Sequence, residues 1–320
     1  MGRLLGWQLT RLGHSVTVYE QASRSAPQSA AHVAAAMLAP MSELPDAEPQ
    51  VYELGLRSLQ LWPALLQELD VPFGMDGSIF VAHGTDGPLL DKFYRSADRK
   101  APESGMRWIT GAQIAELEPE LKFQRGLWIP NEGWLDNRGL LAALESVCGE
   151  IVYNTPVDPQ NLSADLVIDC RGTGSSDPQL RAVRGEVARV HAPEVSLSRP
   201  VRLMHPRYQI YIAPRVDHHY VIGATQLESE ASHGMTVRSA LELLSAAFTV
   251  HSGFAEAEIT ELSAGLRPAY ADHQPKIEWQ GEVLHINGLF RHGYLMAPAL
   301  VEQAMNMIES TCSVLLTANR

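Results

Sequence analysis

The chain begins with a helix-and-strand unit that limits the folds open to the rest of it. Leu5, Leu9 and Leu12 follow one another at helical spacing and Gly13 comes next, so the pattern predicts a helix that ends there. The alternating run 15–19 then predicts a strand, which Glu20 closes. A short helix that leads directly into such a strand is typical of α/β proteins with a parallel sheet.

The position of Glu20 favours a dinucleotide site. A Rossmann unit places an acidic residue roughly 20 positions beyond its glycine loop, where the carboxylate accepts hydrogen bonds from ribose hydroxyls. Gly2 then corresponds to the third glycine of G-x-G-x-x-G, while the first strand and the first two glycines are missing. Because that strand is central and buried in such sheets, we expect a slot in the sheet and an incomplete phosphate cradle. The same helix–turn–strand pattern also occurs in α/β proteins that bind no nucleotide.

Composition excludes several classes of protein. The net charge of -12 argues against a nucleic-acid surface, and we find no run of about 18 apolar residues that could cross a membrane. The three cysteines are widely separated and odd in number, which fits reduced thiols in the cytoplasm better than disulfides or a zinc site. We therefore expect a cytoplasmic protein without a metal.

The order of the predicted elements indicates two interleaved domains. An apolar strand over 164–170 ends in a glycine-rich turn that contains Gly172 and Gly174, as a parallel sheet requires where its backbone meets a ligand. The segment 29–40 is rich in alanine and predicts a short helix, the segment 208–214 predicts a strand, and a helix is expected from Pro298. We predict a Rossmann-like α/β nucleotide-binding domain and a mostly antiparallel β substrate domain; the first comprises 1–45, 130–180 and 260–320, and the second 46–129 and 181–259.

Two arginines are the strongest candidates for a substrate site. Arg267 lies near the end of a predicted strand, and Arg291 lies between a strand and the final helix. A guanidinium group binds a carboxylate through two parallel N–H···O bonds, so these arginines suit an acid substrate, although a surface ion pair explains either one as well. Tyr211 could add a hydroxyl to a pocket or simply pack across strands. His292 could act as a base, but its place beside Gly293 favours a turn residue.

These segments together resemble the FAD-dependent D-amino acid oxidase superfamily, and most closely its glycine oxidase branch, which is associated with thiazole synthesis in thiamine biosynthesis. The resemblance covers essentially the whole chain in the right order. It rests on the segments 2–20, 34–40, 132–136, 169–174, 184–186, 211–215, 222–225, 265–268 and 291–298.

The resemblance implies how a cofactor would lie. Glu20 would bind the FAD ribose, Val157 would meet the adenine, and the turn at Arg291 would present N–H groups to the flavin. The residues implied to contact FAD are Gly2, Glu20, Ala35, Ala36, Met37, Val157, Gly172, Gly174, Arg291, His292, Gly293, Tyr294 and Leu295. Ala36 stands where relatives often carry glycine. No cysteine falls near Arg267, where some relatives anchor flavin covalently, so FAD is expected to be noncovalent.

The resemblance also implies a reaction. Arg267 would hold the substrate carboxylate with help from Tyr211, and the backbone around Arg291 would position the amine. The expected substrates are oxygen and a small amino acid or amine, and the products are a 2-oxo acid, ammonia and hydrogen peroxide. Three alternatives stay open: a D-amino acid dehydrogenase with another electron acceptor, a relative of the oxidase module that modifies tRNA, which the acidic chain disfavours, and a truncated flavoprotein without activity. A homo-oligomer is also possible.

Overall fold

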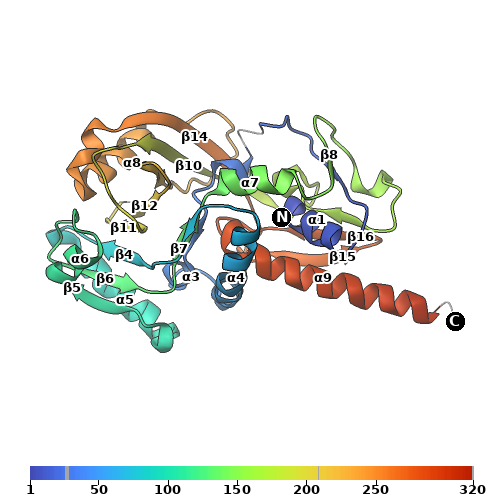
Figure 1. The fold of residues 1–320 in the computed structure, drawn as a ribbon, viewed down its shortest axis with the longest axis horizontal. Helices are drawn as coiled ribbons and strands as arrows, with labels where there is room; N and C mark the ends of the chain where they lie inside the picture. Colours follow the sequence, from blue (N-terminus) through green and yellow to red (C-terminus); the bar gives the residue numbers. More distant parts are fainter. Residues whose placement is uncertain (26–28, 208, 319–320) are drawn as a thin grey trace.

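The computed structural model describes residues 1–25, 29–207 and 209–318, and its largest feature is an eight-stranded sheet. The strand order is β14-β10-β13-β12-β11-β4-β6-β5, and neighbouring strands are antiparallel except for β11 and β4 (left half of Figure 1). The strands are β14 (Glu258–Ala269), β10 (Arg181–His191), β13 (His219–Gly223), β12 (Gln209–Pro214), β11 (Val201–Met204), β4 (Ser78–Val81), β6 (Arg125–Ile129) and β5 (Arg107–Thr110). This sheet is the mostly antiparallel part that the sequence predicts. Tyr208, the first residue of the strand predicted over 208–214, lies outside the described residues.

The parallel strands lie on the other side of the molecule in two separate sheets (Figure 1). In one, β1 (Thr17–Tyr19) pairs parallel with β8 (Glu150–Val152). In the other, β9 (Val167–Asp169) pairs parallel with β16 (Val283–Asn287), which pairs antiparallel with β15 (Lys276–Gln280). Among the described strands β1 and β9 thus each have one unpaired edge, which agrees with the predicted slot. Strand β15 was not predicted; it joins β16 through a turn at Gly281, whose φ is 63°.

Helices cover both parts of the structure. The opening helix α1 (Gly2–Arg11) buries Leu5 and Leu9, leaves Leu12 exposed and ends at Gly13, which has φ 87° as a left-handed turn requires. The other helices are α2 (Ala30–Val33), α3 (Pro40–Glu43), α4 (Pro49–Glu68), α5 (Gly87–Lys100), α6 (Gly111–Leu117), α7 (Asn137–Glu145), α8 (Val237–Val250) and α9 (Gly293–Ala318). The 3₁₀ turns are η1 (Gly84–Asp86), η2 (Pro102–Ser104), η3 (Pro159–Asn161), η4 (Gly172–Gly174) and η5 (Ser252–Glu256).

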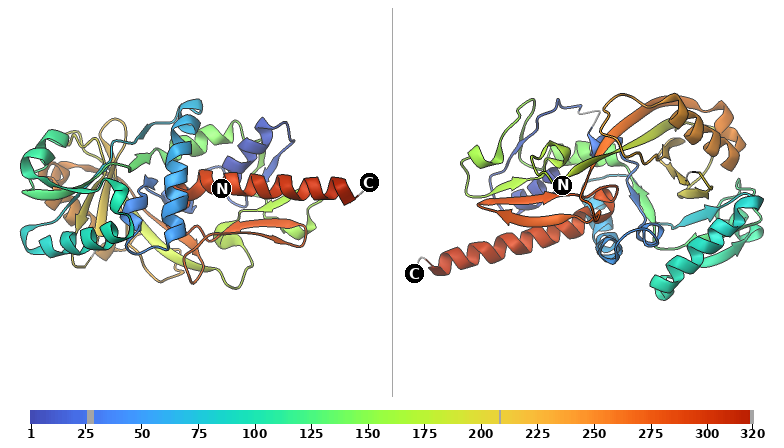
Figure 2. Two further views of the ribbon diagram at one scale, coloured as in Figure 1. Left: turned by 90° about the horizontal axis from the view of Figure 1, so that it is seen from below. Right: turned by 180° about the vertical axis from the view of Figure 1, so that it is seen from behind.

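Helix α9 starts at Gly293, five residues before the start predicted at Pro298. The helix extends through the proline because side chains of α4 hydrogen-bond the backbone groups around it. A proline within a helix cannot donate to the carbonyl four residues earlier, here that of Tyr294. The Trp62 indole of α4 donates to this carbonyl at 2.9 Å instead, and the Ser58 hydroxyl oxygen accepts from the Ala299 N–H at 3.2 Å. The two helices therefore cross at this point, as the left view of Figure 2 shows.

The prediction of a helix for 29–40 was right only for its first part. Helix α2 ends at Val33, and the chain then extends into β2 (Met37–Leu38), which forms a small sheet of order β2-β7-β3 with β7 (Gly133–Leu135) and β3 (Phe73–Gly74). The helix does not continue because side chains elsewhere in the fold take up its carbonyl groups, as described below. A local propensity pattern holds no information about such distant donors.

The observed strands confirm the predicted fold class. The predicted domain boundaries stay a prediction; the one at residue 260 falls inside β14. No helix in the described part of the chain has the length and apolar character to cross a membrane.

The packing of α4 generates a stability prediction. Leu66 is fully buried in the core between α4, α9 and the parallel strands, whereas Leu12 is 62% exposed. Leu66→Ala should lower the free energy of unfolding by about 2–5 kcal/mol, because it leaves a cavity, and Leu12→Ala by less than about 0.5 kcal/mol. Urea denaturation of both variants tests this; equal losses would contradict the packing described here.

Candidate active site

A cavity of about 1680 Å³ runs from the edges of β1 and β9 to the strands β10, β12 and β14. Its lining contains nearly all of the predicted site residues: Gly2, Glu20, Ala35, Ala36, Met37, Val157, Gly172, Tyr211, Arg267, Arg291, His292, Gly293, Tyr294 and Leu295. Gly174 is the exception, since it ends η4 outside that lining. Residues from both ends of the chain thus meet around one space.

Carboxylate and glycine residues shape the end of the cavity near β1. Glu20 follows β1 directly, and its Oε1 accepts from the Ala22 N–H at 2.9 Å. Gly172 has φ 59°, which lets the chain turn sharply after β9, and its carbonyl accepts from Asn287 at 2.9 Å. An acidic side chain directly after β1 and a glycine turn directly after β9 fit the ribose and diphosphate of a dinucleotide.

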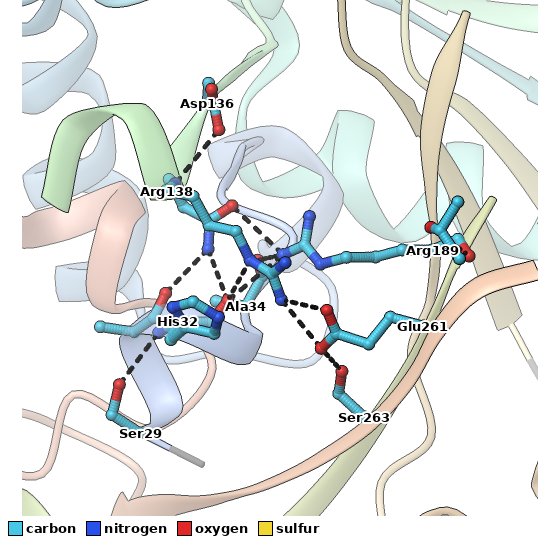
Figure 3. Close-up of polar contacts among 11 residues, drawn as sticks. Ser29, His32, Ala34, Asp136, Arg138, Arg189, Glu261 and Ser263 are labelled. Atoms are coloured by element: carbon cyan, nitrogen blue, oxygen red, sulfur yellow. Dashed lines mark hydrogen bonds and ion pairs between the residues drawn. The ribbon is translucent and has the colours of Figure 1, made fainter. Parts of the chain in front are cut away.

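The backbone of residues 31–35 lines the middle of the cavity and is held by side chains from outside α2. Asn137 donates to the carbonyls of Ala31 and His32 at 2.8 and 2.9 Å, and Arg189 donates to the carbonyls of His32 and Ala34 at 3.3 and 3.2 Å. Figure 3 shows the Arg138 and Arg189 side chains converging on this segment. These donors replace the helical hydrogen bonds that end at Val33.

Burial and positive neighbours affect the arginines of this cluster. Arg189 is desolvated and lies near Arg138, which together lower its pKa to about 10, and Arg138 itself pairs with Glu261 through two 2.8 Å contacts. Arg215 donates to the Ala35 carbonyl at 2.6 Å, and burial, followed by the charge of Arg189, lowers its pKa to about 9. The backbone beside the cavity is thus fixed by strong donors.

Ala36 has a conformation that explains why a glycine would suit its position. Its φ is 48°, in the left-handed region, where a side chain costs roughly 1–2 kcal/mol. Its carbonyl accepts from the Leu135 N–H at 3.2 Å, which ties it to β7.

The amino end of α9 points into the same cavity. The His292 carbonyl accepts the first helical hydrogen bond, from Met296 at 2.9 Å, so Gly293, Tyr294 and Leu295 are the first-turn residues. The N–H groups of a first turn have no acceptor inside their helix and carry the positive end of its dipole. They suit a carbonyl or anionic oxygen of a ligand. His292 is buried, and burial lowers its pKa to about 4, so it is neutral near pH 7 and is a weak base.

Two glycines make room for Arg267 and Tyr211 on the large sheet. Arg267 on β14 lies over Gly185 of β10, where a Cβ would overlap its guanidinium group. Tyr211 on β12 lies over Gly223 of β13, where a Cβ would be 2.9 Å from the hydroxyl. Arg267 donates to the Thr225 carbonyl at 3.1 Å, and burial lowers its pKa. This guanidinium group therefore faces the cavity with a neutral partner.

The sequence analysis missed a carboxylate beside these residues. Glu43, the last residue of α3, contacts Arg291 at 2.6 Å and Arg202 of β11 at 3.3 Å, and His292 lies 3.7 Å away. Burial alone would raise the pKa of Glu43, but Arg291 and Arg202 lower it to about 2. The available sequence signals were weak: a single acid in a short apolar segment and a single arginine in the apolar strand 201–204.

Two adjacent exposed histidines lie outside the cavity lining. His218 ends the turn between β12 and β13, where Asp217 and His218 have φ of 55° and 56°, and His219 begins β13. No group of three possible metal ligands occurs among the described residues.

The fold and the site together define a class of protein. A helix–strand unit of the kind that binds dinucleotides lies at one end of the cavity, and a partly buried guanidinium group lies at the other, as in an enzyme that holds a dinucleotide cofactor beside an acid substrate.

Comparisons with known proteins identify the family. The family model "FAD dependent oxidoreductase" matches residues 1–304, and the chain belongs to this family. It is 41% identical over 306 residues to a putative thiamine biosynthesis oxidoreductase ThiO of Rhizobium etli, covering 93% of this chain and 90% of that protein. The structure is similar to glycine oxidase of Geobacillus kaustophilus (TM-score 0.83, 23% identity, 96% and 91% of the two chains). It is also similar to iminodiacetate oxidase of Chelativorans sp. BNC1 (TM-score 0.82, 21% identity, 96% and 92%).

These findings confirm the predicted family, the oxidoreductase class and FAD as the cofactor. The cavity fits this cofactor: Glu20 could accept hydrogen bonds from ribose hydroxyls, the turn at Gly172 could lie beside a diphosphate, and the N–H groups of the first turn of α9 could meet a flavin oxygen.

The neutral state of buried His292 generates a prediction on pH. Its folded-state pKa of about 4 lies below the ordinary 6.5, so between these values the unfolded chain binds the proton and the folded protein does not. Stability from this residue is complete above about pH 6.5 and is lost as the pH falls toward 4. In the wild type, His292 should therefore lower the free energy of unfolding by roughly 3 kcal/mol between pH 7 and pH 4. His292→Gln should lack this part of the pH dependence.

The measurement is urea unfolding at both pH values. His14→Gln, which changes an exposed histidine, serves as the control and should leave the pH dependence as in the wild type. An unchanged pH dependence in His292→Gln would show that folding does not lower the pKa of His292.

Proposed function

We propose that this protein is an FAD-dependent oxidase of glycine or another small amine that carries one carboxylate. The products would be the 2-oxo acid, ammonia and hydrogen peroxide, with oxygen as the electron acceptor. FAD would be held without a covalent bond. A cytoplasmic location and a homo-oligomer stay predictions from the sequence.

The observation that carries this proposal is the environment of Arg267. It is a partly buried, desolvated guanidinium group that faces the cavity and has a neutral carbonyl, that of Thr225, as its hydrogen-bond partner. A buried charge without an opposite charge is unfavourable, so a carboxylate ligand would gain a strong, charge-assisted contact there. An amino acid supplies such a carboxylate.

The residues of this chain would mainly bind and orient the substrate. Arg267 would hold the carboxylate with two parallel hydrogen bonds, and Tyr211, whose pKa is raised by burial, would donate its neutral hydroxyl group. The backbone near Arg291 would place the amine, which binds already deprotonated. Bound FAD supplies the two-electron acceptor for the Cα–H bond. No side chain needs to act as an acid or base, which agrees with the low pKa of His292.

The direct test of this function is peroxide release by purified, yellow protein across a panel of small amino acids and amines. Glycine or a similar small monocarboxylate amine is expected to give the highest kcat/KM. Oxidation with an artificial electron acceptor but without peroxide would favour the dehydrogenase alternative. Yellow protein without turnover of any amine, or colourless protein, would contradict the proposed function.

Arg267→Ala should raise KM for a carboxylate substrate by at least about 30-fold, since loss of a charged bidentate contact costs on the order of 2–5 kcal/mol. Arg207→Ala, which changes an exposed arginine, is the matched control and should leave KM unchanged. Steady-state peroxide assays measure both. An unaltered KM in Arg267→Ala would remove this residue from the substrate site.

Gly185→Ala should also raise KM for a carboxylate substrate, although it removes no charge. Its new methyl group would displace the Arg267 guanidinium group, so we expect KM to rise at least about tenfold. Gly84→Ala, where the methyl group meets no atom within 4 Å, is the control. If Gly185→Ala behaves as the control does, Arg267 does not lie over β10 in the working enzyme.

A further inference from the structure

Arg291 lies in the cavity, but its guanidinium group is already engaged on both sides. Its Nη2 contacts Glu43 Oε2 at 2.6 Å, and its Nη1 donates to Gln226 Oε1 at 3.0 Å. Arg267, by contrast, has a neutral backbone carbonyl as its partner. The two arginines are close enough that the charge of Arg291 lowers the pKa of Arg267. The guanidinium group of Arg267 is therefore available to an anion in the cavity, whereas that of Arg291 is already paired with Glu43 and Gln226.

Arg202 is engaged by the same carboxylate. Its Nη2 donates to Glu43 Oε1 at 3.3 Å, and its guanidinium carbon lies 5.3 and 5.9 Å from the ring centres of Phe80 and Tyr211. Glu43 thus uses one oxygen for Arg202 and the other for Arg291. Both arginines line the cavity, as does Glu43.

The position of Glu43 is fixed by its own helix. It ends α3, in which the Ser42 N–H and hydroxyl both donate to the buried Glu132, at 2.6 and 2.7 Å. Ser78 of β4 donates to the same Glu132 carboxylate. The residue before Glu43 is therefore anchored in a buried polar network, which holds the end of α3 beside the two arginines.

We propose that Glu43 determines substrate specificity, because it occupies Arg291 and Arg202 and so leaves Arg267, of these three described arginines, as the one guanidinium group available to a substrate anion. The site then accepts amines with a single carboxylate and disfavours those with a second one. A second carboxylate would have to displace Glu43 from its ion pairs or lie beside its negative charge, and both are unfavourable. This inference rests on the proposed function, whose substrate class it narrows.

The variant Glu43→Gln keeps the shape of the side chain and removes its charge, which frees Arg291. We expect the ratio of kcat/KM for iminodiacetate to that for glycine to rise at least about tenfold. Glu53→Gln, which changes an exposed glutamate on α4, should leave this ratio as in the wild type. A Glu43→Gln enzyme that retains flavin and oxidises glycine at an unchanged ratio would overturn the inference while leaving the proposed function intact.

A binding measurement on the wild-type holoenzyme decides the inference without turnover and without a variant. Acetate and malonate are titrated separately against the flavin absorption spectrum. We expect malonate to bind no more than about tenfold more tightly than acetate, because no second arginine is available to it. A gain of about a hundredfold or more would overturn the inference. Failure of the wild type to oxidise any amine would count against the proposed function alone, since this titration would still report on Glu43.

Discussion

The site depends on a partly buried positive charge with a neutral partner. Arg267 lies across β10 in the space that Gly185 leaves, and its hydrogen bond goes to the backbone of Thr225. A guanidinium group in this setting has lost much of its hydration and gains little from a carbonyl in return. Such an arrangement is unfavourable for folding and favourable for binding a carboxylate, which is why we place substrate recognition there.

The rest of the cavity brings two unrelated kinds of sheet to that charge. The short parallel strands β1 and β9 contribute Glu20 and the turn at Gly172, and the first turn of α9 contributes its N–H groups. The antiparallel strands contribute Arg267 and Tyr211. Between them, the 31–35 backbone is held by arginine and asparagine side chains (Figure 3). A segment held by these hydrogen bonds thus connects the two ends of the cavity.

Local patterns were sufficient to predict most of the elements, and the family resemblance supplied most of the predicted residues that line the cavity. The spacing of Leu5 and Leu9 predicted α1, and Glu20 and Arg267, which local patterns singled out, both line the cavity. The predictions failed where the structure depends on contacts between residues that are far apart in the sequence. Helix α2 is shorter than its alanines suggest, because Asn137 and Arg189 bind its carbonyls.

Glu43 shows that contacts between distant parts of the chain also escape prediction at the site itself. Nothing near it in the sequence distinguishes it from a solvated acid, and its two partners come from β11 and from the turn before α9. Gly185 makes room for the Arg267 side chain because β10 pairs with β14 in a fixed register. That register sets Val183, two residues before Gly185, opposite Arg267. Register between distant strands and ion pairs across a cavity are products of the tertiary fold, so a single sequence gives no direct access to them.

The central claim, that Arg267 is the anion-binding group of the cavity, is tested most directly by a spectral titration of the flavin-containing protein with acetate. Our account predicts saturable binding to the wild type and at least about 30-fold weaker binding to Arg267→Met, which keeps an unbranched side chain but loses the charge. Equal dissociation constants for the two proteins would contradict it.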